Sequence, residues 1–190
     1  YITVNVSGRQ LMQQNLLMVV EEAVRNAKMR PSDLRLEITE TALMDSPGDA
    51  ARVLGELREF GVKIYLDDFG TGFSSLSHLH KLPVDALKID RSFVTSLLLP
   101  DRPAIVESIL ALARTLKTGV VAEGIEDDVQ ASELERLGCS HAQGFLFSRP
   151  LPAEAIEDVL EANLPLGPAI ERGEREVAEG GAVRFFTSKA

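Results

Sequence analysis

Acidic side chains suited to holding metal ions occur at several separate points of the sequence. Asp67 and Asp68 stand side by side before a glycine-rich turn, and Glu37 and Glu123 lie in two other apolar stretches. Carboxylates brought close together repel one another, and each is costly to desolvate unless a cation compensates it. Hard divalent cations with oxygen ligands, Mg²⁺ or Mn²⁺, are the natural compensation. An adjacent pair such as Asp67 and Asp68 can serve two ions, an arrangement suited to hydrolysing phosphate esters.

Other polar residues share this setting, each near the end of an apolar stretch. Asn5 offers an amide oxygen, Lys88 a single cation and Gln143 a further polar group. Taken alone, each has an ordinary explanation as a strand cap, a surface lysine or a plain polar residue, and Asp-Asp before Phe-Gly is a common turn sequence. The joint pattern places a polar or acidic group at the ends of six successive apolar stretches. That pattern favours one shared site over chance.

Six strand-then-helix units are predicted to carry these residues. Strands that alternate with helices are parallel, because each crossover helix returns the chain to the same edge. Within the helix at 127–137, Val129, Leu134 and Leu137 are expected to face inward. We predict strands over 1–6, 34–39, 62–66, 85–89, 119–122 and within 139–145, and helices over 9–28, 47–60, 105–116, 127–137 and 152–160, with a short helix after the glycine-rich loop at 70–72.

Two α/β architectures fit this order, an open doubly wound sheet and a closed eightfold barrel. No Gly-x-Gly-x-x-Gly follows any predicted strand, and the polar residues recur at the carboxyl ends of successive strands. That distribution favours a TIM-like (β/α) barrel, in which active sites assemble from several strand ends. A complete barrel takes about 250 residues. The 190 residues of this chain hold six units, which implies that pieces of the barrel are missing.

The last part of the sequence has a different character. Residues 171–181 are charged and contain glycine, with little to bury, which is typical of a linker or a tail. We expect one domain over residues 1–164, followed by a tail or linker over 165–190.

Composition excludes several classes of protein. The net charge is −9, which argues against binding to nucleic-acid polymers, because such binding relies on Lys and Arg neutralising phosphates. The single cysteine, Cys139, excludes an internal disulfide framework and fits a reducing compartment. No apolar stretch approaches the roughly 20 residues of a membrane span, and no signal peptide is recognisable. We expect a cytoplasmic protein without a membrane segment in this chain.

Short motifs around the polar residues resemble the EAL family of cyclic-di-GMP phosphodiesterases. Residues 67–76 read Asp-Asp-Phe-Gly-Thr-Gly-Phe-Ser-Ser-Leu, which is similar to the most specific signature of that family. The resemblance covers about residues 1–161. The other motifs follow in family order: VNVS at 4–7, EITE at 37–40, LKID at 87–90, AEGIE at 122–126 and QGF at 143–145.

The resemblance implies hydrolysis of cyclic-di-GMP to linear pGpG in bacterial second-messenger signalling, with two Mg²⁺ or Mn²⁺ ions. By motif, Asn5, Glu37 and Asp67 would hold one ion. Asp67, Asp68 and Glu123 would hold the other.

The same motifs imply catalytic and substrate-binding positions. Lys88 would contact the nucleophilic water and assist its deprotonation. Gln143 is similar to the polar group that the family places near that water, and with Lys88 and Glu123 it completes the catalytic set. Glu126 and Phe145 match positions that contact a guanine base, Phe145 by stacking.

The resemblance also implies a regulatory loop. Glu40 matches a glutamate that braces the loop after Asp68. That loop, through Ser75, is implicated in dimer contacts and regulation, so a homodimer is expected. Such domains often sit beside a GGDEF or sensory domain.

The sequence departs from the family at one point. In the family, the Glu-Ala-Leu strand, with its metal-binding Glu and a nearby substrate-contacting Arg, precedes the asparagine motif. The sequence given starts at Tyr1, just before that motif, so we expect a barrel that is incomplete at its N-terminus. For this chain alone we expect little activity and marginal solubility, because an incomplete barrel exposes sheet edges and core. Within a longer protein we expect an active enzyme.

Three hypotheses follow from these observations. The first is a metal-dependent cyclic-di-GMP phosphodiesterase, favoured because every metal-ligand position present is filled. The second is a catalytically inactive cyclic-di-GMP receptor or protein-interaction module, favoured only by the missing strand. The third, another metal-dependent phosphohydrolase on a barrel, requires the motif match to be a coincidence.

Overall fold

The computed structural model describes residues 1–44, 47–72, 79–80, 82–99 and 103–161. The predicted tail over 165–190 lies outside the described residues, as does Ser75. The domain boundary at residue 164 therefore stays a prediction.

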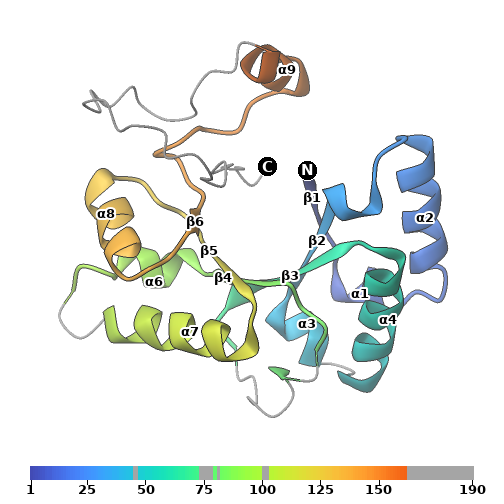
Figure 1. Ribbon diagram of the computed structural model, residues 1–190, viewed down its shortest axis with the longest axis horizontal. Coiled ribbons are helices and arrows are strands. Elements are labelled where there is room, and N and C mark those ends of the chain that lie inside the picture. Colours follow the sequence, from blue (N-terminus) through green and yellow to red (C-terminus); the bar gives the residue numbers. More distant parts are fainter. Residues whose placement is uncertain (45–46, 73–78, 81, 100–102, 162–190) are drawn as a thin grey trace.

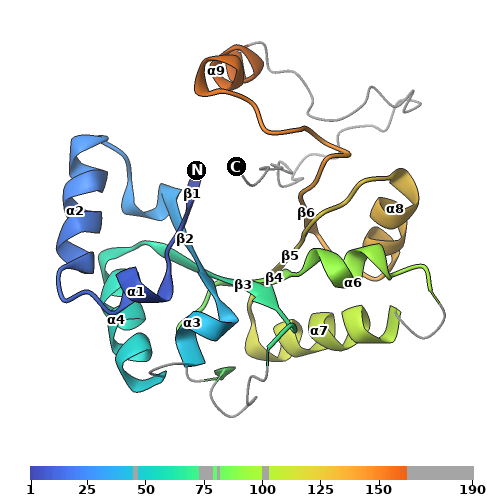
Figure 2. The ribbon, with the colours of Figure 1, turned by 180° about the vertical axis from the view of Figure 1, so that it is seen from behind.

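A single parallel sheet organises the described residues. Its six strands lie in chain order, from β1 at one edge to β6 at the other. The strands curl into an arc, with helices on the convex side and an open side between β1 and β6 (Figures 1 and 2). The strands are β1 Ile2–Asn5, β2 Leu34–Thr39, β3 Lys63–Phe69, β4 Ala86–Ile89, β5 Gly119–Ala122 and β6 His141–Ala142.

Helices lie between successive strands, as the alternating pattern predicts, except between β3 and β4, where residues 73–78 and 81 lie outside the described residues. The short helix predicted after residues 70–72 falls in this part of the chain and stays a prediction. None of the helices within the described residues combines the length and apolar character that a bilayer span requires. The helices are α1 Gly8–Leu11, α2 Leu16–Asn26, the 3₁₀ helix η1 Pro31–Asp33, α3 Glu40–Met44, α4 Pro47–Phe60, α6 Arg91–Thr95, α7 Pro103–Leu116, α8 Asp128–Arg136 and α9 Ala153–Glu161.

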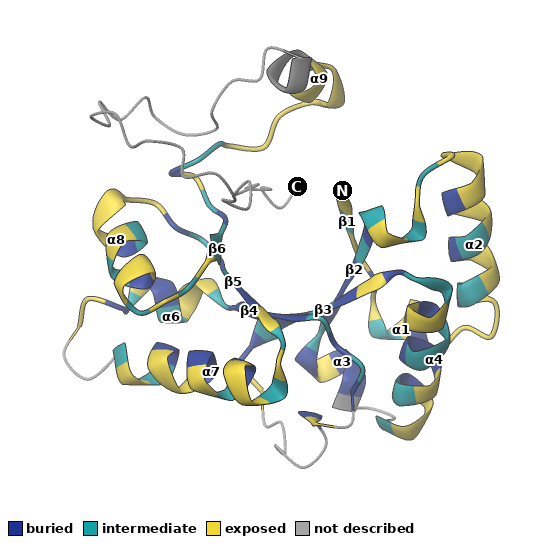
Figure 3. Ribbon diagram, in the orientation of Figure 1, coloured by how far each residue is buried: buried dark blue, intermediate teal, exposed yellow. Residues whose placement is uncertain are grey.

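The hydrophobic core lies between the convex face of the sheet and these helices. Successive residues of a strand point to opposite faces, so every second side chain of a strand points toward the helices. Ile38 of β2 and Ile64 of β3 are fully buried in this layer, together with Leu54 of α4 and Val106 of α7. The central strands are buried, whereas the helices are exposed on their outer faces (Figure 3). The opposite, concave face is left to the polar residues.

The prediction of a single helix over 9–28 is wrong, because this stretch forms two helices, α1 and α2. A capping box starts α1: Ser7 Oγ accepts from the Gln10 N–H at 3.3 Å, and Gln10 Oε1 accepts from the Ser7 N–H at 3.0 Å. Leu11 and Leu16 are both buried. Five residues apart on one helix, they would lie about 140° apart. The break between α1 and α2 lets both side chains reach the core.

The prediction that Val129 faces inward from α8 is wrong. Val129 is 60% exposed, whereas Leu134 is buried. These two residues are also five positions apart and cannot share a helix face. Gln130, four positions before Leu134, is buried instead, and its Oε1 accepts a hydrogen bond from the Glu126 N–H at 2.8 Å.

Candidate active site

A buried group of charges centred on Lys88 lies on the concave face at the carboxyl ends of the strands. The Lys88 side chain is 1% exposed, and its Nζ contacts carboxylate oxygens of Glu37, Asp67 and Glu123, with Asp67 Oδ1 at 3.1 Å. Burial opposes the charge on Lys88, but the three carboxylates together raise the pKa of its ammonium above the ordinary value. The lysine is therefore protonated at neutral pH and holds these carboxylates together.

The sheet register explains why these side chains meet. Asn5 at the end of β1 lies opposite Glu37 of β2, and Asp67 of β3 lies opposite Thr39, two residues farther along β2. Residues two apart on a strand share a face. Glu37, Asp67 and Asn5 therefore come to the same rim of the arc. Asn5 is exposed on the edge strand, beside the buried group.

Asp68 joins this rim through an irregularity of β3. Neighbours on a regular strand point to opposite faces, but the pairing of β3 with β4 shifts between Leu66 and Phe69, and Asp68 has a φ of 54°. Aspartate tolerates this left-handed conformation better than most residues. As a result, ligand oxygens of Asp67, Asp68 and Glu123 lie within 4.8 Å of one another. Three convergent carboxylates, with an amide oxygen nearby, are a donor set that fits Mg²⁺ or Mn²⁺.

Gln143 is tied directly to this group. Its Nε2 donates a hydrogen bond to Glu123 Oε1 at 2.7 Å, and the Gln143 side chain is buried. The Gln143 backbone N–H donates to the Ala122 carbonyl at 2.8 Å, which continues the pairing of β5 with β6 beyond the strands. Gln143 thus fixes one oxygen of the Glu123 carboxylate.

Glu126 and Phe145 follow Glu123 and Gln143 by three and two positions, and each has a charged neighbour. Glu126 Oε1 accepts from an Arg91 guanidinium nitrogen at 2.5 Å, and the Arg149 guanidinium lies 4.8 Å from the centroid of the Phe145 ring. Phe145 is 45% exposed. Their segments are joined, because Leu146 N–H donates to the Ile125 carbonyl at 3.0 Å.

Glu40, at the start of α3, contacts the loop after β3. It is buried, and its Oε2 accepts a hydrogen bond from the Gly70 N–H at 3.0 Å. A Cβ on Gly72 would lie 2.6 Å from Glu40 Oε1, so glycine at that position makes room for the carboxylate. The loop residue Ser75 lies outside the described residues.

Asp90 and Arg91, at the end of the LKID motif and just after it, make contacts of their own. Asp90 does not join the acidic group within the described residues; its Oδ1 accepts from the Ser92 N–H at 3.0 Å and caps α6. Arg91, which the sequence analysis did not single out, pairs with Glu126. Its signal was spacing: Arg91 follows Lys88 by three positions, as Glu126 follows Glu123.

The sequence matches one protein family over most of its length. The match is to the EAL domain and covers residues 1–150. This chain belongs to the EAL domain family. Six parallel strands with crossover helices and an open side are therefore part of the TIM-like barrel of EAL domains, incomplete in this chain, as predicted.

Curated and solved EAL proteins are similar to this chain. The bifunctional diguanylate cyclase/cyclic di-GMP phosphodiesterase MucR of Pseudomonas aeruginosa is 45% identical over 82% of the chain and 23% of MucR. A solved PaMucR phosphodiesterase in complex with c-di-GMP superimposes with a TM-score of 0.78 at 45% identity, covering 82% of this chain and 63% of that one. A manganese and cyclic-di-GMP complex of Klebsiella pneumoniae BlrP1 gives a TM-score of 0.72 at 32% identity, covering 78% and 38%. The chain spans about a fifth of the length of the curated relatives that it matches.

Proposed function

We propose that this EAL domain hydrolyses cyclic-di-GMP to linear pGpG with the help of two Mg²⁺ or Mn²⁺ ions. The observation that carries the proposal is the buried group in which Lys88 contacts three carboxylates while Asp67, Asp68 and Glu123 converge within 4.8 Å. So much negative charge in one buried place calls for cations beyond a single lysine. Relatives named as cyclic di-GMP phosphodiesterases support the choice of substrate.

The metal ions would be held by residues from four strand ends. Asn5, Glu37 and Asp67 would hold one ion, and Asp67, Asp68 and Glu123 the other. When bound, divalent ions supply positive charge that stabilises a phosphoryl group during displacement and lowers the pKa of water. Asp67 is common to both sets, so the proposal depends on it most.

The chain's own residues would control the water and its proton. In the reaction, an oxygen of water forms a bond to phosphorus and one P–O bond to a sugar breaks, leaving linear pGpG. The proton that the water loses is balanced by protonation of the released sugar oxygen. Lys88 Nζ would contact the attacking water, stabilise negative charge on its oxygen and so assist its deprotonation. Gln143 would keep the Glu123 carboxylate in place through its 2.7 Å hydrogen bond.

Guanine recognition would take place on the outer rim. Phe145 offers an exposed ring on which a base can stack. The Glu126 carboxylate is an acceptor, which suits the N–H donors on the Watson–Crick edge of guanine. Glu40 would brace the loop after Asp68 through its bond to Gly70.

Hydrolysis of cyclic-di-GMP with Mn²⁺, followed by chromatography of pGpG, tests the proposal on the complete gene product. We expect Asp67→Asn to lower kcat by about 10³-fold, because both ion sites lose a ligand. The control is Asp33→Asn, which removes a carboxylate paired with Arg30 on η1, away from the rim. It should leave kcat unchanged.

Two outcomes would contradict the proposed phosphodiesterase activity or its two-ion arrangement. Binding of cyclic-di-GMP by the wild type without turnover would favour the receptor hypothesis. Persisting turnover in a folded Asp67→Asn variant would overturn the two-ion arrangement. Calorimetric titration measures whether the variant still binds Mn²⁺, and circular dichroism measures whether it is still folded. The two measurements together separate loss of metal binding from loss of folding.

A further inference from the structure

Two ion pairs join β4 and the start of α6 to the segment after β5. The inner pair is Lys88 with Glu123, and the outer pair is Arg91 with Glu126, so both members move three positions along the chain from one pair to the next. The Glu123 N–H also donates to the Ile89 carbonyl at 3.1 Å, which holds the backbones together. The inner pair is buried with 1% and 6% side-chain exposure, and the outer pair is 58% and 46% exposed.

The stem of Arg91 contacts the backbone between the two glutamates. Gly124 has a φ of 70°, and a Cβ there would lie only 2.3 Å from Arg91 Cγ. Glycine at 124 therefore serves two needs, a left-handed backbone and room for the arginine stem. Arg91 thus packs on the 123–126 segment with its methylenes and pairs with that segment's end through its guanidinium.

The start of α6 fixes Arg91 itself. Asp90 caps the helix through the Ser92 N–H at 3.0 Å, and Arg91 is the first helical residue. Across the segment, Gln130 accepts the Glu126 N–H at 2.8 Å, so the Glu126 backbone is held from α8 while its side chain is held from α6. The carboxylate at the rim is therefore set by a contact that bridges two neighbouring strand ends.

We infer that Arg91 is a positioning residue, which fixes the 123–126 segment and holds the Glu126 carboxylate in the orientation that meets a guanine base. This inference rests on the proposed function for its ligand. The pair is exposed, so its effect lies in orientation more than in stability. Arg91 acts through Glu126, and Lys88 and Glu123 carry the chemistry.

The kinetic test compares variants of the complete gene product with cyclic-di-GMP and Mn²⁺. We expect Arg91→Gln to raise KM by about three- to fivefold, the range that an exposed ion pair can contribute, with kcat within about twofold of wild type. Arg91→Lys keeps the charge and should recover part of the loss. In a Glu126→Gln background, Arg91→Gln should have no further effect on KM, since its partner is already gone.

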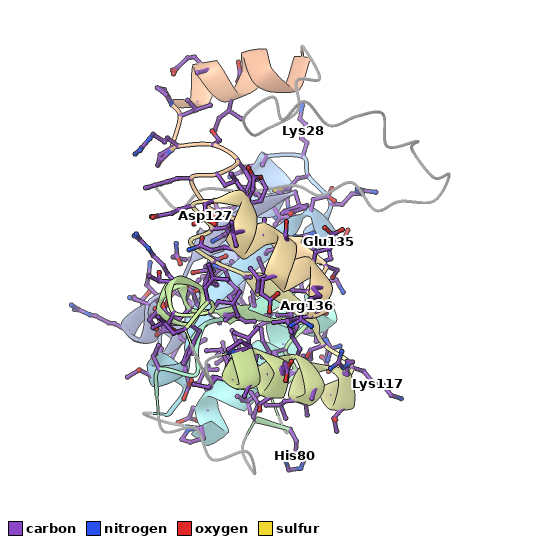
Figure 4. All side chains as sticks on the ribbon, turned by 90° about the vertical axis from the view of Figure 1, so that its left-hand side faces the viewer. Lys28, His80, Lys117, Asp127, Glu135 and Arg136 are labelled. Carbon is purple, nitrogen blue, oxygen red and sulfur yellow. The ribbon has the colours of Figure 1, made fainter. Side chains whose placement is uncertain are left out.

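The matched control is Arg136→Gln. The exposed Arg136 pairs with Glu133 at 2.7 Å, within the single helix α8. It lies at the far end of α8 from Asp127, the residue that follows Glu126 (Figure 4). This variant should leave KM unchanged. An equal KM effect of Arg91→Gln with and without Glu126 would overturn the positioning role, as would no effect at all.

Hydrogen–deuterium exchange of the peptide spanning 123–130 tests, without any ligand, whether Arg91 fixes the 123–126 segment. We expect exchange to rise about threefold or more in Arg91→Gln and to stay at the wild-type rate in Arg136→Gln, because local opening rises when a contact to the segment is removed. Unchanged exchange in Arg91→Gln overturns the inference even if the enzyme is active. A wild type that neither binds nor hydrolyses cyclic-di-GMP defeats the proposed function, while the exchange result still decides whether Arg91 holds the segment.

Discussion

A single buried lysine among carboxylates defines the chemistry of the site at the scale of residues. Burying one charge is costly, and a partner removed from such a group leaves an uncompensated charge behind. Contacts of Lys88 Nζ with Glu123, Glu37 and Asp67 offset the cost of burying its charge. The same contacts raise the pKa of its ammonium above the ordinary value, against the effect of burial.

Cys139 offers a test of local burial at the same scale. Burial raises the pKa of its thiol, and its Sγ donates to the His141 carbonyl at 3.2 Å. The thiolate is the reactive form, so we expect alkylation at pH 8 to be at least about tenfold slower in the native protein than in urea. Because this is the only cysteine, mass spectrometry of the whole chain reads it directly.

The pH dependence of stability follows from the same shift. The folded state keeps the thiol proton to higher pH than the unfolded state, so the unfolded state gains by ionising first. The contribution of the Cys139 thiol to the free energy of unfolding is fully present below the unfolded pKa of about 8.5, and it declines as the pH rises above that value. Rapid alkylation of the native protein at pH 8 would contradict this environment for Cys139.

Close backbone approach decides stability at the scale of elements. Gly144 lies between β6 and the rim segment after β5, and a Cβ there would come within 2.2 Å of both the Ile125 nitrogen and its oxygen. Those atoms bond to the Gln143 carbonyl at 3.1 Å and the Leu146 N–H at 3.0 Å. We expect Gly144→Ala to lower the free energy of unfolding by about 3 kcal/mol or more, measured by urea denaturation.

Gly55 is the matched control for that substitution. It lies inside α4, and a Cβ there would meet nothing within 4 Å. Alanine loses less conformational entropy than glycine in a helix, so Gly55→Ala should raise the free energy of unfolding by about 0.5–1 kcal/mol. If both glycine variants behaved alike, the tight contact at Gly144 would not be real.

Metal binding is a property of the whole molecule, because the proposed ligands come from β1, β2, β3 and the end of β5. An ion held by them links strands that are far apart in the sequence. We expect free Mn²⁺ at 100 times its Kd to stabilise the fold by about 2.7 kcal/mol, which raises Tm by about 5–10 °C. Thermal unfolding with and without Mn²⁺ measures the shift, and Asp67→Asn should abolish it while Asp33→Asn should not.

The arrangement of whole chains stays a prediction. The expected homodimer depends on the loop through Ser75, which lies outside the described residues. A neighbouring GGDEF or sensory domain is likewise an expectation from the family. MucR, a relative that is named as bifunctional, supports it without deciding it.

Local patterns in the sequence determined the order of strands and helices and the strand ends that carry Glu37, Asp67, Lys88, Glu123 and Gln143. Alternation in strands and helical spacing are short-range signals, and parallel strands bring their carboxyl ends to one edge. The resemblance to the EAL family then supplied a chemistry for that edge. These expectations needed no knowledge of how distant side chains pack.

Only the tertiary structure decided features that depend on contact between distant segments. It turned Asp68 toward the rim through a positive φ, and it made Gln130 face inward in place of Val129. It also paired Arg91 with Glu126, 35 positions away in the chain. A backbone irregularity or an ion pair between two loops depends on where the strands place those loops in space. Local spacing puts Arg91 and Glu126 three positions after Lys88 and Glu123, but it does not show that the two loops approach one another.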